Sequence, residues 1–295
     1  MAISEELGER RTVEVGAGVV EYRERGSGPA LVFAHGAAVN GDLWREVVPA
    51  VADTYRCITL DVPLGGHAIA LRPDADLSLF GVAAIVADVI DALALDDVTL
   101  VGNDTGGAVS QALVASRPDR IGRLVLTSCD AFENFPPKAV AYLKPTARVP
   151  PALWALVQAM RVRPLQRLPI AYGWATHRRI EPRIMDSFQA GLRSSAGVRR
   201  DFARMLRAAE PSDCQRAADG LRGFDRPALV AWAADDKFFP RAHGKRLAEL
   251  LPQGRFDLVE DSRTFIPEDN PGRLVELIRG FVPERDRAES LHRPG

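Results

Sequence analysis

The stretch Val98-Thr99-Leu100-Val101-Gly102-Asn103-Asp104-Thr105-Gly106 joins an apolar run to a glycine-flanked turn, and a helical pattern follows it. A continuous apolar run of this kind is typical of a strand that is covered on both faces. Glycines two positions before and two after Asp104 let the chain reverse sharply and expose the side chain between them. The stretch predicts a strand-to-helix turn that presents Asp104 as a nucleophile, although such a turn can also simply cap a helix.

An aspartate at this position indicates a different reaction from that of a serine. A serine alkoxide attacks acyl carbons, whereas a carboxylate that attacked an ester would give a mixed anhydride as reactive as its parent. Displacement at an sp3 carbon avoids that problem, because the product is a stable alkyl ester. The bonds that we expect Asp104 to break are therefore carbon–halogen bonds and the C–O bonds of epoxides.

Further apolar runs alternate with helical patterns along the chain. They predict strands at 30–34, 55–61, 123–129, 227–232 and 255–259, and helices at 79–95 and 106–116. This alternation indicates a mostly parallel sheet, with active-site groups at the carboxyl ends of its strands. Asp104, Asp130 and Asp236 all fall at such ends.

The whole pattern resembles the α/β-hydrolase superfamily, and within it the haloalkane dehalogenase and epoxide hydrolase branch, from about Val13 to Val282. His35-Gly36 is similar to the His-Gly turn of that family, and Trp44 follows it. The resemblance implies an α/β fold: a mostly parallel eight-stranded sheet flanked by helices, with an inserted helical cap. We expect a core of residues 1–132 and 224–283, a cap at 133–223 and a disordered tail at 284–295.

The acid of the expected triad has two candidates. Asp236 lies in a segment similar to the family's seventh strand and its turn, at the position of the acid. It can also serve as a turn former before the helix near Pro240. Asp130 follows the sixth strand, where some members of this branch place their acid, and its alternative is a turn residue at the entry to the cap.

The base departs from the family pattern, because the resemblance places the catalytic histidine at Thr264. A threonine hydroxyl cannot take a proton from water at neutral pH. None of the five histidines lies between His243 and His292. His67, in the loop after the fourth strand, is the candidate for a replacement base. A histidine in such a loop is, however, more often a packed residue without a catalytic role.

The resemblance also implies the other residues of the site. The backbone N–H groups of Ala37 and Thr105 would form the oxyanion hole. Substrate contacts are expected from residues around the turn and from the tyrosines of the cap, which can also be packing residues: His35, Asn103, Asp130, Tyr142 and Tyr172. The tryptophan and asparagine donors with which dehalogenases usually hold a halide are missing, as is the proline common after His-Gly in epoxide hydrolases.

Composition excludes some classes of partner. The formal net charge is −1, so neither nucleic acid nor an anionic membrane is indicated. The resemblance implies a small apolar organic substrate, without a cofactor or metal. Cys57, Cys129 and Cys214 lack paired spacing, and the charged stretch Met1 to Thr12 lacks an apolar core. We therefore expect reduced thiols, no secretion signal or membrane span, and a cytoplasmic protein. Oligomeric state is left open. Two other functions stay open as well: a catalytically silent ligand-binding protein, and a lyase or isomerase with Asp104 as general base.

Overall fold

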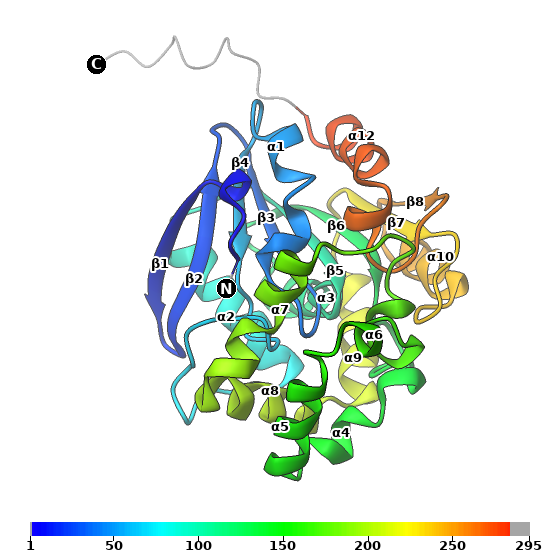
Figure 1. Ribbon diagram of the computed structural model, residues 1–295. Coiled ribbons are helices and arrows are strands. Elements are labelled where there is room, and N and C mark those ends of the chain that lie inside the picture. The colour runs from blue at the N-terminus through cyan, green and yellow to red at the C-terminus, as the bar shows by residue number, and fades with distance from the viewer. Residues whose placement is uncertain (1, 284–295) are drawn as a thin grey trace.

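The computed structural model describes residues 2–283, which form one eight-stranded sheet in the order β1-β2-β4-β3-β5-β6-β7-β8 (Figure 1). The strands are β1 (Glu9–Val15), β2 (Gly18–Arg25), β3 (Ala30–Ala34), β4 (Arg56–Leu60), β5 (Val98–Asp104), β6 (Ile121–Cys129), β7 (Ala228–Ala233) and β8 (Gly254–Val259). β2 pairs antiparallel with β1 and with β4, and the other pairs are parallel. The predicted mostly parallel sheet is confirmed.

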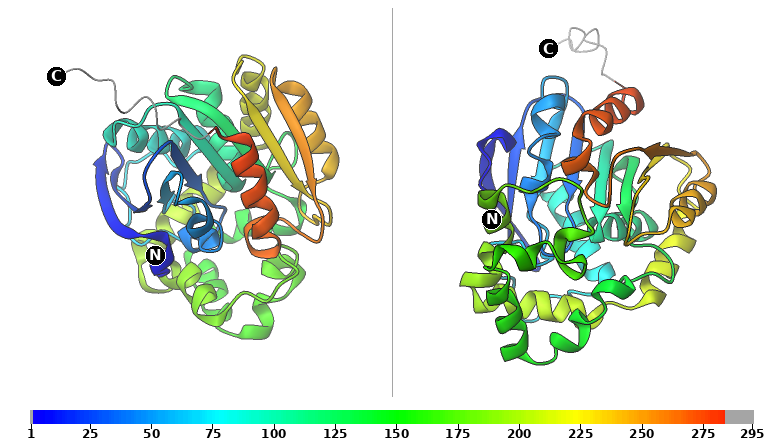
Figure 2. Two further views of the ribbon diagram at one scale, coloured as in Figure 1. Left: turned by 90° about the horizontal axis from the view of Figure 1, so that it is seen from above. Right: turned by 45° about the vertical axis from the view of Figure 1, so that its right-hand side comes forward.

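Helices cover both faces of this sheet (Figure 2). The helices before β6 are η1 (Glu5–Leu7), η2 (Gly41–Trp44), α1 (Val48–Val51), α2 (Leu79–Ala92) and α3 (Thr105–Ser116). Those between β6 and β7 are η3 (Lys138–Val140), α4 (Leu143–Thr146), α5 (Pro150–Ala159), α6 (Arg163–Gln166), η4 (Pro169–Gly173), α7 (Pro182–Ser194), α8 (Ala196–Ala208) and α9 (Pro211–Leu221). After β7 come α10 (Arg241–Leu250), α11 (Ile266–Asp269) and α12 (Pro271–Phe281).

The core is divided by the sheet because successive side chains of a strand point to opposite faces. In β3, Val32 and Ala34 pack into a cluster with residues of α2, α3 and α9. Leu31 and Phe33 pack on the other face with residues of α1 and α12. The central strands are therefore covered on both sides, which is why they appear in the sequence as continuous apolar runs.

The segment between β6 and β7 gathers most of its helices beyond one end of the sheet, where α4 to α8 lie together below the strands in Figure 1. α9 is the exception, because it packs along α3, and its residues Cys214, Ala217 and Leu221 are buried. A Cβ atom on Gly220 would lie 2.4 Å from the Cβ of Ala115, so the two helices are in close contact. We call η3 through α8 the inserted helices.

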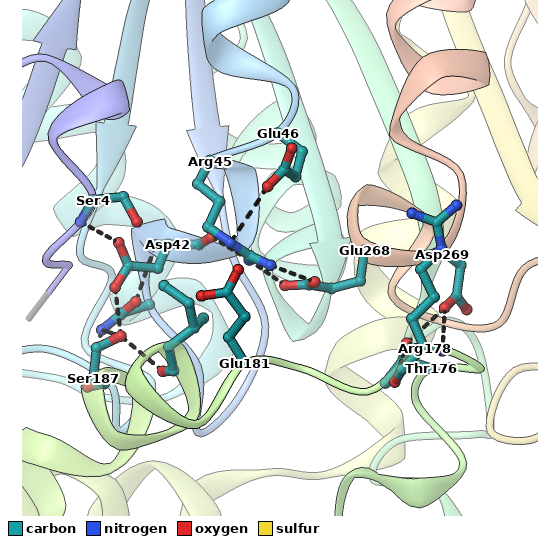
Figure 3. A network of polar contacts seen from close by, with 12 residues as sticks. Ser4, Asp42, Arg45, Glu46, Thr176, Arg178, Glu181, Ser187, Glu268 and Asp269 are labelled. Carbon is teal, nitrogen blue, oxygen red and sulfur yellow. Dashed lines mark hydrogen bonds and ion pairs between the residues drawn. The ribbon is translucent and has the colours of Figure 1, made fainter.

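Two buried carboxylates fasten the inserted helices to the core (Figure 3). Asp42 accepts hydrogen bonds from the backbone N–H of Ser4, at 2.8 Å, and from the hydroxyl of Ser187 in α7. Asp269 accepts from the hydroxyl of Thr176 at 2.6 Å and from the backbone N–H groups of three residues at 2.9–3.0 Å: His177, Arg178 and Arg263. Backbone N–H groups lose their hydrogen bonds to water when they are buried. Each carboxylate therefore provides an acceptor for such groups.

An ion pair lies between these two anchors. The buried guanidinium of Arg45 makes two hydrogen bonds to the buried carboxylate of Glu268, the longer of them 2.8 Å. This bidentate contact joins the segment after η2 to α11. No helix within residues 2–283 has both the length and the hydropathy needed to cross a membrane.

Candidate active site

Asp104 lies at the junction of β5 and α3 with φ 56° and ψ −130°, a backbone conformation that non-glycine residues rarely adopt. The flanking glycines make that turn possible. A Cβ atom on Gly102 would lie 2.5 Å from the hydroxyl of Ser110, and one on Gly106 would lie 2.4 Å from the carbonyl oxygens of Ala34 and His35. The local structure is therefore the sharp strand-to-helix turn that the sequence predicts.

The carboxylate of Asp104 is held through one of its two oxygens. Oδ1 accepts hydrogen bonds from the backbone N–H of Ala37 at 3.2 Å and from the backbone N–H of Thr105, and the Thr105 hydroxyl lies 3.0 Å away. Oδ2 accepts no hydrogen bond from any residue in the range 2–283. The two predicted oxyanion donors thus point at the carboxylate of Asp104 and leave its second oxygen available.

A cavity of about 150 Å³ lies beside Asp104. Its walls are mostly apolar and come from the inserted helices and from core loops; they include Leu143, Leu153, Val157, Leu206, Phe238 and Phe265. Among its few polar residues are Asp104, Thr105 and Asp130. An apolar cavity with a few convergent polar groups is the usual form of a small-molecule site. The part of the chain that the structure describes contains no cluster of His, Cys, Asp or Glu suited to a metal ion.

Asp130 follows β6 and is 1% exposed. Its Oδ2 lies 2.9 Å from the Thr105 hydroxyl, and its Oδ1 has no hydrogen-bond partner among the described residues. Burial, reinforced by the charge of Asp104, raises the pKa of the Asp130 carboxyl well above its ordinary value. The sequence indicates either a catalytic acid or a turn residue at Asp130. In the structure its side chain lines the cavity.

Asp236 and Thr264 contact each other behind the cavity lining. Asp236 Oδ1 accepts the Thr264 hydroxyl at 3.0 Å and the backbone N–H groups of Phe238 and Phe239, both at 2.8 Å. Burial raises the pKa of Asp236 to about 6, although these hydrogen bonds favour its charged form. The backbone contacts match the turn-forming role expected for Asp236, and the Thr264 contact places threonine against the candidate acid.

His35 and Asn103 do not line this cavity, in contrast to the substrate contacts expected of them. His35 is fully buried with its Nδ1 2.8 Å from the carbonyl of Gly36, and burial lowers its pKa to about 4. The Asn103 side-chain amide donates to the Thr264 carbonyl at 2.7 Å and to the Thr127 hydroxyl at 2.9 Å. Both residues support the loops around the site.

The structure also places His67 away from the Asp104 cavity. Its Nε2 lies 3.6 Å from Asp201 in α8, and its Nδ1 lies 3.4 Å from the backbone nitrogen of Gly65. His67 lines a separate small cavity together with Asp61. The loop after β4 packs against α8, an element far along the chain, and that contact turns the imidazole toward Asp201 and out of the cavity lining.

The two tyrosines do line the cavity, but their hydroxyl groups are engaged. Tyr172 donates to the carbonyl of Ala38 at 2.7 Å and accepts from Gln189, and Tyr142 donates to the carbonyl of Ile170 at 2.9 Å. Burial raises the pKa of both phenols. Tyr172 also borders a second cavity, lined by arginines and by the exposed His177. His243 is half-buried against Phe132, and His292 lies outside the described residues.

Sequence reasoning missed the role of the Thr105 side chain, which contacts Asp104 and Asp130 at once. It also missed Gln189, which lines the cavity from α7. The only signal for Thr105 was its place directly after the nucleophile, where a hydroxyl can reach the carboxylate. All three cysteines are buried with free thiols, as expected.

Comparisons with known proteins agree with this architecture. A family model described as alpha/beta hydrolase fold matches residues 29–148. Haloalkane dehalogenase 2 of Mycobacterium tuberculosis is 28% identical, covering 92% of this chain and 93% of that protein. An alpha/beta hydrolase fold protein from Burkholderia ambifaria superposes with a TM-score of 0.77 at 22% identity, covering 93% of this chain and 97% of that one. A haloalkane dehalogenase from Bradyrhizobium elkani gives a TM-score of 0.74 at 20% identity, covering 92% and 96%.

Proposed function

We propose that this chain, which has the α/β-hydrolase fold and haloalkane dehalogenase-like homologues, forms a covalent ester between Asp104 and a small apolar substrate. The bond is made by displacement at an sp3 carbon that carries a halogen or an epoxide oxygen. Hydrolysis of the ester is slow, because the residue that contacts the candidate acid Asp236 is Thr264.

The placement of the Asp104 carboxylate carries this proposal. Three donors from Ala37 and Thr105 converge on Oδ1, whereas Oδ2 is free of hydrogen bonds from residues 2–283 and its side chain lines an apolar cavity. A carboxylate oxygen without hydrogen bonds in a poorly hydrated site is a better nucleophile than one in water, because attack requires little desolvation. The same donors stabilise the carbonyl oxygen of the ester that forms.

The second half of the proposal concerns the water that would cleave the ester. General-base assistance needs a group that accepts a proton near neutral pH, and the Thr264 hydroxyl instead donates its own hydrogen to Asp236. We also propose that the inserted helices act as a cap, since Leu143, Leu153 and Leu206 form part of the cavity wall. A cap of this kind excludes water and limits substrate size.

Intact-mass spectrometry after incubation with matched panels of haloalkanes and epoxides tests the first half. The expected result is a stable adduct on the wild-type protein and none on Asp104→Ala. Labelled Asp104→Ala protein would overturn the assignment of the nucleophile. No adduct with any reagent, together with binding of the same compounds, would instead support a ligand-binding protein without covalent chemistry.

Hydrolysis of the preformed adduct tests the second half. Thr264→His should release the product roughly a hundredfold to ten-thousandfold faster than the parent, the range typical of general-base assistance. Thr264→Ser, which keeps a hydroxyl next to Asp236, is the matched control and should hydrolyse as slowly as the parent. Equal rates for the histidine and serine variants would contradict the role given to position 264.

A further inference from the structure

We propose that Asp130 is the proton donor of this site: a neutral carboxylic acid, linked to Asp104 through the Thr105 hydroxyl, that protonates an oxygen leaving group. This assignment selects epoxides over haloalkanes as the substrate class. It rests on the proposed attack by Asp104, and the first experiment below tests the proton on Asp130 without any substrate.

The geometry requires a shared proton. The Thr105 hydroxyl oxygen lies 3.0 Å from Asp104 Oδ1 and 2.9 Å from Asp130 Oδ2. A hydroxyl has one hydrogen and can donate to only one of these oxygens. The other short contact is a hydrogen bond only if the carboxyl on that side carries a proton and donates it to the Thr105 oxygen.

The proton belongs on Asp130. Asp104 Oδ1 already accepts from the backbone N–H groups of Ala37 and Thr105, which favour the charged form of that carboxylate. Asp130 has no second donor for either oxygen among the described residues, and its Oδ1 is buried without a partner. An ionised Asp130 would therefore be a buried anion with a single hydrogen bond, next to a second anion. The upward direction of its pKa agrees with this arrangement.

The other titratable groups around Asp130 do not change that result. The charges that act on its pKa come from Asp104 and Asp236, and both raise it. The thiols of Cys129 and Cys214 lie nearby with raised pKa values, so they stay neutral. Lys144 lines the cavity, but its ammonium pairs with Glu210 at 2.5 Å. None of the ion pairs formed within residues 2–283 includes Asp104 or Asp130.

With an epoxide the charge in the site stays constant through the reaction. Asp104 Oδ2 forms a bond to one epoxide carbon, that C–O bond of the ring breaks, and the released oxygen takes the proton of Asp130. The product is a hydroxyalkyl ester of Asp104, and the negative charge has moved to Asp130. The Thr105 hydroxyl, which no longer faces an anion at Asp104, then donates to Asp130.

The cavity would stabilise a departing halide less well than a departing oxygen. The halide departs as an anion that needs N–H or O–H donors. The hydroxyl hydrogens of Tyr172 and Tyr142 are donated to backbone carbonyls, and one of the two N–H groups of the Gln189 amide is donated to Tyr172. The proton of Asp130 does not help, because a halide is too weak a base to take it. The site thus offers an acid to an oxygen and little to a chloride or bromide.

Infrared spectroscopy of the carbonyl stretch of protonated carboxyls tests the proton directly in the full-length protein. At neutral pH the difference spectrum of the wild-type protein and Asp130→Asn should contain the band of a protonated carboxyl, and the difference spectrum with the exposed Asp74→Asn should contain none. No such band in the Asp130→Asn difference spectrum would overturn the proposal whether or not any substrate reacts.

Labelling rates test the use of that proton. An epoxide and a bromoalkane of equal chain length should label the wild-type protein at different rates, with the epoxide faster. Asp130→Asn should slow epoxide labelling roughly a hundredfold or more and slow bromoalkane labelling far less, so that the ratio of the two rates falls. Wild-type epoxide labelling should also decline as the pH rises through the raised pKa of Asp130. Equal slowing for both reagents would overturn the proposal.

Thr105 provides a finer test of the link. Thr105→Ser keeps the bridging hydroxyl and should keep the infrared band and the epoxide preference. The isosteric Thr105→Val removes the bridge, so it should keep the carboxyl of Asp130 neutral, shift its band to higher frequency because the hydrogen bond is lost, and reduce the epoxide preference. If Thr105→Val behaved as Thr105→Ser does, the hydroxyl would not link the two carboxyls. Absence of any adduct with a normal infrared band would count against the attack by Asp104 and leave the proton on Asp130 established.

Discussion

At the scale of single residues, the absence of a side chain at Gly36 leaves room for the side chain of Asp104. A Cβ atom there would lie 2.5 Å from the Cβ of Asp104 and 2.6 Å from its Cγ and Oδ1. Gly36→Ala should therefore displace the carboxylate and slow adduct formation by about a hundredfold, the usual effect of misplacing a reacting group by about 1 Å. Gly16→Ala is the control, since a Cβ at Gly16 meets no atom within 4 Å. Unchanged labelling rates in both variants would contradict this account.

Asp236 is a residue whose charge costs stability. Its pKa is about 6 in the fold against an ordinary value of 3.8, so the folded state prefers the neutral form. That preference is present below about pH 4 and is lost as the pH rises through 6. Asp236→Asn removes the charge and keeps an acceptor for Phe238 and Phe239.

For Asp236→Asn we expect a gain in unfolding free energy of up to about 3 kcal/mol at neutral pH and little change near pH 4. Urea denaturation of both proteins at the two pH values measures the difference. A variant that is less stable than the wild type at neutral pH would show that the carboxylate form of Asp236 contributes more through its hydrogen bonds than burial costs.

At the scale of secondary-structure elements, the connection between η4 and α7 depends on Asp269. Asp269→Ala would leave four donors on two chain segments without their acceptor, which should cost about 3 kcal/mol in unfolding free energy. Trypsin should then cleave the native protein after Arg178 or Arg179. Asp186→Ala is the control: its pairs with Arg163 and Arg193 are half-exposed and should be worth at most about 1 kcal/mol. Equal losses in the two variants would contradict the anchoring role.

The elements that sequence predicted well are those with two covered faces. β3, β5 and β7 are buried on both faces, so each appears in the sequence as a short, continuous apolar run that is easily recognised. β1 was not predicted, because it is an exposed edge strand rich in charge, Glu9 through Val15, and only its pairing with β2 makes it a strand. The segment predicted as the cap, residues 133–223, includes α9, which has the same helical pattern as its neighbours but packs on α3.

The candidate site also has parts that could be predicted from the sequence and parts that could not. The backbone parts of the site follow from local residues: the turn at Asp104 and the donors Ala37 and Thr105 depend on nearby glycines and strand ends. The direction of the His67 side chain was not predictable, because Asp201 lies on a distant helix whose docking no local pattern encodes. The bridge formed by Thr105 likewise needs the distance between β5 and β6, which only the assembled sheet provides.

At the scale of the whole molecule, buried carboxyls set the pH dependence of stability. Among residues 2–283, five carboxyls have raised pKa values: Asp61, Asp104, Asp130, Asp236 and Glu268. Each favours the fold at low pH and loses that contribution as the pH rises through its folded pKa. His35 opposes them, because its pKa of about 4 makes acidification below 6.5 unfavourable. The carboxyls with lowered pKa values, such as Asp53 and Asp186, act only below about pH 4.

The thermal midpoint of the wild-type protein should therefore fall as the pH rises from about 5 to about 8, since five groups outweigh one. The change should be smaller in Asp236→Asn and larger in His35→Gln, which removes the opposing group. Differential scanning calorimetry across this range measures it. A midpoint that rises over the same interval would mean that these carboxyls are ionised in the fold without penalty.

The strand order also bears on how the chain reaches this structure. β6 and β7 are neighbours in the sheet, yet all the inserted helices and α9 separate them along the chain. Closing so long a loop costs entropy before the strands gain any pairing, so contacts of this kind form late in folding. Asp104 and Asp130 precede that loop and Asp236 follows it. During refolding, hydrogen-exchange pulse labelling should protect β3 and β5 before β7, and the three carboxyls should come together only in the final step.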